Sequence, residues 1–166
     1  MPKLIIVCGL PGSGKTTLAD ELSRRLGVAC LHKDSIKECL FDELGYSSLD
    51  DSRKAGKLSI ATLFRLAEEQ LLNGVDIIIE APFNFTDDYA VFENWKKKYG
   101  LVIYSVICSI DKAERERRFR ERERHHAHHD VVGHEFDYAE IPGKKIHIVT
   151  NKPTTELVGI VMAGLV

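Results

Sequence analysis

The chain has 166 residues, of which 44% are hydrophobic, so it has the size of one ordinary domain and can bury a substantial core. Its 23 basic and 25 acidic residues leave a formal net charge of -2, which excludes a global basic field that could hold a long nucleic acid. No apolar run approaches the length of a transmembrane helix, and the four cysteines contain no C-x-x-C pair. We therefore expect a single domain whose cysteines are buried free thiols, and we expect the protein to be cytoplasmic.

A glycine-rich motif lies between the first predicted strand and the first predicted helix. The strand is the apolar run Leu4–Cys8, which shows no alternation, as expected for a parallel strand covered on both faces. The helix carries leucines at helical spacing and should end at Gly27. Between them, Gly9–Thr17 reads G-L-P-G-S-G-K-T-T and fits the pattern G-x-x-x-x-G-K-[ST] at every fixed position.

This spacing suits a loop whose backbone N–H groups converge on phosphate oxygens, because glycine permits unusual backbone angles and close approach of a ligand. Lys15 would reach the β- and γ-phosphates, and the Thr16 hydroxyl would bind Mg²⁺. The following helix turns its positive dipole end toward the anion. The sequence therefore predicts that this loop binds ATP and Mg²⁺. The predicted nucleotide-binding residues of the loop are Gly9, Pro11, Gly12, Ser13, Gly14, Lys15, Thr16 and Thr17.

The second predicted strand, Val28–His32, leads into a polar stretch that should begin a helix. Ile36, Leu40 and Leu44 would form the apolar stripe of that helix. Asp34 lies at its start and has two interpretations, the N-cap of the helix or a catalytic carboxylate. The stretch alone does not separate these two interpretations.

A long helix is predicted from Asp50 to Leu72, where Leu58, Leu66 and Leu71 are among the apolar residues that stand between polar ones. Gly56 marks a weak point of this helix or a start nearby. The β-branched run Val75–Glu80 then predicts a buried strand that delivers a carboxylate to its C-terminal end. Such an acid can act as a base or anchor a metal ion through water, and hydrogen bonding to a neighbouring loop is the structural alternative.

The second half of the chain continues the alternation of strands and helices. The predicted elements are a helix from Thr86, a strand Leu101–Ile110, a charged helix Asp111–Arg124, a mobile loop His125–Glu135, a strand Ile146–Thr150 and a helix Thr154–Val166. In the charged helix, Ala113 and Phe119 should be the few packing contacts. The adjacent histidines at 125–129 point to phosphate or substrate contact or to an exposed polar loop, more than to a zinc site.

This alternation predicts an α/β fold of three layers, with a five-stranded parallel sheet, helices on both faces and a small lid. In such folds ligands bind at the carboxyl ends of the strands. The sequence places the glycine-rich loop, Asp34, Glu80 and Asn151 at those ends. Phosphoryl transfer requires phosphate neutralisation, a metal ion and often a carboxylate that takes the acceptor proton, and this set offers a candidate for each.

Together these residues resemble the P-loop kinases related to nucleoside monophosphate kinases, in the branch with polynucleotide 5′-kinases, chloramphenicol phosphotransferase and zeta-toxin-like kinases. The resemblance rests on G-L-P-G-S-G-K-T-T, on the Asp that opens the helix after the second strand, on the acid that ends the third strand and on the arginine-rich segment. It implies that ATP phosphorylates a hydroxyl of a small molecule or of a nucleotide or polynucleotide end, although the net charge does not favour nucleic acid.

The same resemblance assigns roles to individual residues. Asp34 matches the general base, and a lid covers about residues 115–135. Arg118 matches the lid arginine near the adenine, and Arg122, one turn later, matches the arginine at the transferring phosphate. Lys37 stands where polynucleotide 5′-kinases commonly have an arginine, and lysine lacks the bidentate fork that binds a phosphate.

Two alternatives from other classes are a GTP- or ATP-hydrolysing switch and a nucleotide-binding protein without an acceptor. Asn151-Lys152 resembles the start of the guanine-reading N-K-x-D, but Thr154 stands where the motif needs Asp. Asp42–Gly45 spells D-x-x-G, but it lies in a predicted helix. A kinase should need a second substrate for ATP consumption, whereas a switch should not.

Overall fold

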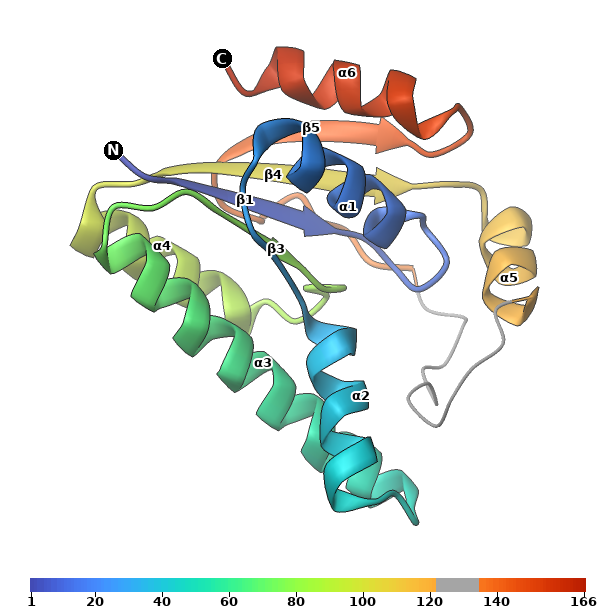
Figure 1. The fold of residues 1–166 in the computed structure, drawn as a ribbon. Helices are drawn as coiled ribbons and strands as arrows, with labels where there is room; N and C mark the ends of the chain where they lie inside the picture. The colour runs from blue at the N-terminus through green and yellow to red at the C-terminus, as the bar shows by residue number, and fades with distance from the viewer. Residues whose placement is uncertain (122–134) are drawn as a thin grey trace.

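Five parallel strands form the central sheet among residues 1–121 and 135–166, the ranges that the computed structural model describes. Their order is β2-β3-β1-β4-β5, with β1 in the centre and hydrogen-bonded to β3 and β4 (Figure 1). The strands are β1 (Lys3–Cys8), β2 (Cys30–His32), β3 (Ile77–Glu80), β4 (Val102–Ser109) and β5 (Lys144–Val149). All pairings are parallel, so the carboxyl ends of the strands lie at one edge.

Helices cover both faces of this sheet, which confirms the predicted three-layer α/β fold (Figure 1). One face of β1 packs with α1 and α6 around Leu18, Leu22 and Val161. The other face packs with α3 and α4, where Phe92 and Trp95 are buried. The helices are α1 (Lys15–Leu26), α2 (Lys33–Leu44), α3 (Leu49–Leu72), α4 (Asp87–Tyr99), α5 (Lys112–Glu121) and α6 (Thr154–Gly164).

The helix α2 begins at Lys33, two residues before the start that an N-cap at Asp34 would give, which changes the interpretation of Asp34. His32 occupies the N-cap position, and Asp34 lies in the first turn of the helix. The prediction that Asp34 is the N-cap was therefore wrong, although a carboxylate in the first turn is still favoured by the helix dipole. The apolar stripe was also wrong in part, because Phe41 is buried whereas the Leu44 side chain is 75% exposed.

The helix α3 begins at a capped residue and runs without interruption through Gly56. The Ser48 hydroxyl accepts a hydrogen bond from the Asp51 N–H at 3.1 Å, so the weak point or nearby start expected at Gly56 was wrong. The buried face includes the apolar residues Leu63, Ala67 and Leu71, which recur every four residues. Leu58 and Leu66, two of the apolar residues from which the helix was predicted, are exposed, because they lie away from that face.

Two further expectations about burial need correction. In α5 the buried residue is Arg115, whereas Ala113 is exposed. All four cysteines are free, but Cys39 is exposed and only Cys8 and Cys108 are fully buried. No helix within the two described ranges is long and apolar enough to cross a membrane.

Candidate active site

The glycine-rich loop connects β1 to α1 and has a backbone that only glycine accommodates without strain. Gly9 and Gly12 have φ angles of 148° and 83°. A Cβ atom built on Gly9 would lie 2.4 Å from the Cys108 carbonyl oxygen, and one on Gly12 would lie 2.4 Å from the Arg115 carbonyl oxygen. The loop therefore packs against both β4 and α5 so closely that a side chain at either position would collide.

Lys15 lies at the start of α1 and is buried, with its ammonium group facing a carboxylate. The distance from Lys15 Nζ to Glu80 Oε1 is 3.7 Å, and the two side chains are 6% and 3% exposed. Glu80 is the last residue of β3, which runs beside β1. The structure thus brings the predicted phosphate ligand and the predicted metal anchor together, because their strands are neighbours.

His32 completes this group, and the sequence analysis did not single it out. Its Nδ1 lies 2.8 Å from Glu80 Oε2, and its Nε2 lies 3.0 Å from Asp20 Oδ1 on α1. Hydrogen bonding with Cys30 and with Glu80 raises the pKa of His32 to about 10. A signal was present in the sequence, because His32 and Glu80 both end strands of one parallel sheet, and they are paired in register.

Asp34 follows His32 by two residues and lies at the same edge of the sheet. It is in the first turn of α2, with its side chain 35% exposed and its Oδ1 3.4 Å from Lys33 Nζ. Thr16 and Thr17 are in the first turn of α1, directly after Lys15. The folded chain therefore gathers the predicted base and the loop residues at the carboxyl edge of the sheet, where Figure 1 shows α2 beginning.

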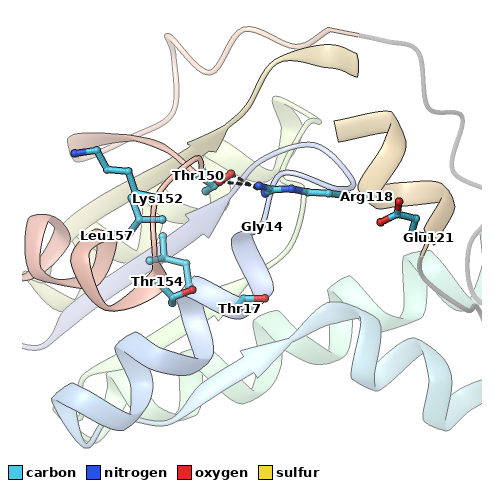
Figure 2. A pocket seen from close by; sticks show the side chains of 9 residues that line it. Gly14, Thr17, Arg118, Glu121, Thr150, Lys152, Thr154 and Leu157 are labelled. Carbon is cyan, nitrogen blue, oxygen red and sulfur yellow. Dashed lines mark hydrogen bonds between the residues drawn. The ribbon is translucent and has the colours of Figure 1, made fainter. Parts of the chain in front are cut away.

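A pocket of about 360 Å³ opens on the other flank of the loop (Figure 2). Its lining residues are Gly14, Thr17, Leu18, Arg118, Glu121, Thr150, Lys152, Thr154 and Leu157. Arg118 reaches into it from α5 and donates hydrogen bonds to Thr150, at 2.9 Å to the carbonyl oxygen and 3.3 Å to Oγ1. Thr150 Oγ1 in turn donates to the Ser13 carbonyl oxygen at 2.6 Å. Asn151, predicted to bind nucleotide, is exposed and is not among the lining residues.

The arginines of α5 have distinct surroundings, which the sequence spacing could not separate. Arg115 is buried, and its guanidinium donates to Glu135 at 2.9 Å. Arg117 is exposed and pairs with Glu114 and Glu121 of its own helix. Arg118 also pairs with Glu114, but unlike Arg117 it extends to Thr150, directly after β5. Two further predictions, Arg122 and the histidines at 125–129, lie outside the described residues, as does most of the predicted lid.

The side-chain donors at this edge of the sheet are suited to a magnesium ion that phosphates help to bind, and less suited to a metal ion held by protein groups alone. No group of three or more His, Cys, Asp or Glu residues that could hold a metal ion occurs within residues 1–121 and 135–166. The predicted ligands, the Thr16 hydroxyl and the Glu80 carboxylate, are oxygen donors. Magnesium prefers oxygen and is usually bound by one or two protein groups together with phosphates and water. The residues present are therefore compatible with this ion.

Comparison with known proteins assigns the family. A family model described as an AAA domain matches residues 4–140, which includes the loop, Asp34 and Glu80. The chain belongs to this AAA domain family. A protein of Sulfurisphaera tokodaii assigned as an adenylate kinase is 32% identical over 77 residues, which are 46% of this chain. The match spans 39% of that protein's length.

Solved structures of kinases share the whole fold of this AAA domain protein. A crystal structure of an assigned kinase from Chloroflexus aurantiacus has a TM-score of 0.88 and 27% identity, and the match covers 99% of both chains. The APS kinase of Mycobacterium tuberculosis in complex with AMPPNP and APS has a TM-score of 0.66 and 20% identity, over 99% of this chain and 97% of that chain. The chain has a P-loop kinase fold.

Proposed function

We propose that this chain is an ATP-dependent kinase, a single catalytic domain that transfers the γ-phosphate to a hydroxyl group of an acceptor. The observation that carries the proposal is the position of Lys15, buried at the glycine-rich loop and 3.7 Å from Glu80. The ion pair lies at the N-terminal end of α1. A phosphate bound there would face both the Lys15 ammonium group and the positive end of the helix dipole. The kinase fold and the adenylate kinase match support the same activity.

The nucleotide would lie across both flanks of the loop. Its phosphates would contact the loop N–H groups and Lys15, and its base would enter the pocket lined by Arg118 and Thr150. Thr16 and Glu80 are the oxygen donors that would hold magnesium, which supplies charge neutralisation on the phosphates when it is bound.

In the proposed reaction the Asp34 carboxylate takes the proton from the acceptor hydroxyl. The hydroxyl oxygen then forms a bond to the γ-phosphorus, while the bond from that phosphorus to the β–γ bridging oxygen breaks and ADP leaves. The location of Asp34 supports this role, because it lies in the first turn of α2 beside the strand that ends at His32. Its partial exposure would let an acceptor reach the carboxylate.

The acceptor is proposed as a small molecule or a nucleotide or polynucleotide end, in the branch of polynucleotide 5′-kinases, chloramphenicol phosphotransferase and zeta-toxin-like kinases. The motif residues support that branch. The net charge of -2 disfavours a long nucleic acid as the acceptor.

The test is the substitution Asp34→Asn, assayed by transfer of labelled γ-phosphate and by ATP affinity. We expect ATP binding to be retained and turnover to fall by about two to four orders of magnitude, because the amide cannot accept the proton. Asp42→Asn is the matched control, since Asp42 is exposed on the same helix. An Asp34→Asn protein that loses only thermal stability would show that Asp34 is structural and would remove the base from the proposal.

A further inference from the structure

The two carboxylate oxygens of Glu80 have different partners. Oε1 faces Lys15 Nζ at 3.7 Å, whereas Oε2 faces His32 Nδ1 at 2.8 Å. The Glu80 side chain is only 3% exposed, so water cannot replace a partner that is removed. A buried carboxylate without a compensating charge is strongly unfavourable. Glu80 therefore needs a partner both before and after a nucleotide binds.

Nucleotide binding should change one of these two contacts and leave the other. The lysine of this motif reaches the β- and γ-phosphates, so the Lys15 ammonium would turn from Glu80 toward the phosphates. His32 contacts the other oxygen of Glu80, so this contact does not depend on the position of Lys15. It can remain on Oε2 while Oε1 loses Lys15.

We propose that His32 is a positioning residue, which holds Glu80 through Oε2 so that Oε1 stays directed toward the nucleotide and its magnesium. This inference rests on the proposed function and adds a residue to it. His32 would touch neither the phosphates nor the acceptor. Its effect would be exerted through the orientation of the Glu80 carboxylate.

The surroundings of His32 are suited to this role. Both ring nitrogens lie within hydrogen-bond distance of a carboxylate oxygen, Nδ1 of Glu80 and Nε2 of Asp20. The His32 side chain is 16% exposed, whereas Asp20 is 54% exposed. The ring is thus fixed between the helix that carries Lys15 and the strand that carries Glu80, with its inner contact shielded from water.

A simple structural tie between α1 and β3 would also use these contacts, so the test must report on magnesium as well as on stability. Two substitutions separate the two ring nitrogens. In His32→Asn the amide nitrogen lies near the position of Nδ1 and can donate to Glu80. In His32→Gln the amide lies near the position of Nε2 and faces Asp20 instead.

The experiment is calorimetric titration of ATP into each folded protein, once with EDTA and once with Mg²⁺, which requires no phosphoryl transfer. We expect magnesium to tighten ATP binding in the unsubstituted protein, and this tightening to fall by about 10-fold or more in His32→Gln. His32→Asn should keep most of it. Affinity in EDTA should be similar in all three proteins.

Asp20→Asn is the control, because it changes only the exposed end of the contacts and its amide oxygen can still accept from His32. It should leave the magnesium effect unchanged. Equal magnesium effects in His32→Asn, His32→Gln and the unsubstituted protein would overturn the inference and make His32 a structural tie. An unsubstituted protein that binds no ATP would overturn the proposed function as well, so the two failures are distinguishable.

Discussion

The two flanks of the glycine-rich loop are held in different ways. On the β3 side the contacts are between buried charges, Lys15 with Glu80 and Glu80 with His32. On the β5 side they are hydrogen bonds to backbone oxygens, from Thr150 to the Ser13 carbonyl and from Arg118 to the Thr150 carbonyl. A charged side chain in an ion pair can exchange its partner for a phosphate when a nucleotide binds. Hydrogen bonds to backbone oxygens hold the conformation of the loop whether or not a nucleotide is bound. We infer that the first flank responds to the nucleotide and the second supports the loop.

The largest effect should come from the first flank, through Lys15→Ala. Phosphoryl transfer should fall by more than about 10³-fold, because the charge that stabilises the transferring phosphate is lost. The fold should survive, since His32 still compensates Glu80. Turnover and circular dichroism should be measured together, with the exposed Lys97→Ala as the control. Near-parental activity in the folded variant would contradict the assignment of the loop.

A smaller effect is expected on the second flank, from Arg118→Ala. The affinity for ATP should fall roughly 10-fold, because the pocket loses a charged donor that lines it. Arg117→Ala is a matched control. Arg117 is the neighbouring residue, carries the same charge and also pairs with Glu114, but its side chain is exposed and does not line the pocket. Its affinity should stay close to that of the unsubstituted protein. Equal losses in both variants would indicate a general charge effect and no specific contact.

The smallest effect should be on stability, through Thr150→Val. The substitution removes the hydroxyl that donates to Ser13, so the free energy of unfolding should decrease by about 1 kcal/mol. Urea denaturation measures this change, and Thr155→Val, at an exposed position nearby, is the comparison. A loss no greater than that of Thr155→Val would show that the loop does not depend on this contact.

The difference between the flanks also explains what the sequence could predict. The loop, Lys15 and Glu80 follow from local patterns, because a parallel strand delivers its last residue to a known edge. The contact between His32 and Glu80 could have been predicted by the same argument, because His32 ends β2 and β2 pairs with β3. The role of Thr150 was not reachable, since its contacts to Ser13 and Arg118 join residues that are 137 and 32 positions apart.

The second feature that the sequence did not predict is the rotation of each helix about its own axis, which decides the face that it buries. The spacing of leucines predicted α2 and α3 but not the faces that they bury, because Leu44 of the predicted apolar stripe and Leu58 of the long helix are both exposed. In α5 the arginines at 115, 117 and 118 look alike in sequence, and only the contacts of Arg115 with Glu135 and of Arg118 with Thr150 distinguish them. Such choices depend on neighbours that are distant in sequence.

The most direct test of the kinase proposal is whether ATP consumption requires a second substrate. ADP release should be followed with Mg²⁺ and ATP alone, and then with nucleosides, nucleotides, 5′-hydroxyl oligonucleotides, sugars or aminoglycosides added. The account predicts slow release with ATP alone and a large increase with one class of acceptor, which gains the phosphate. That increase should disappear in Asp34→Asn. Rapid release that no acceptor changes, with inorganic phosphate as the product, would contradict the account and favour a nucleotide-hydrolysing switch.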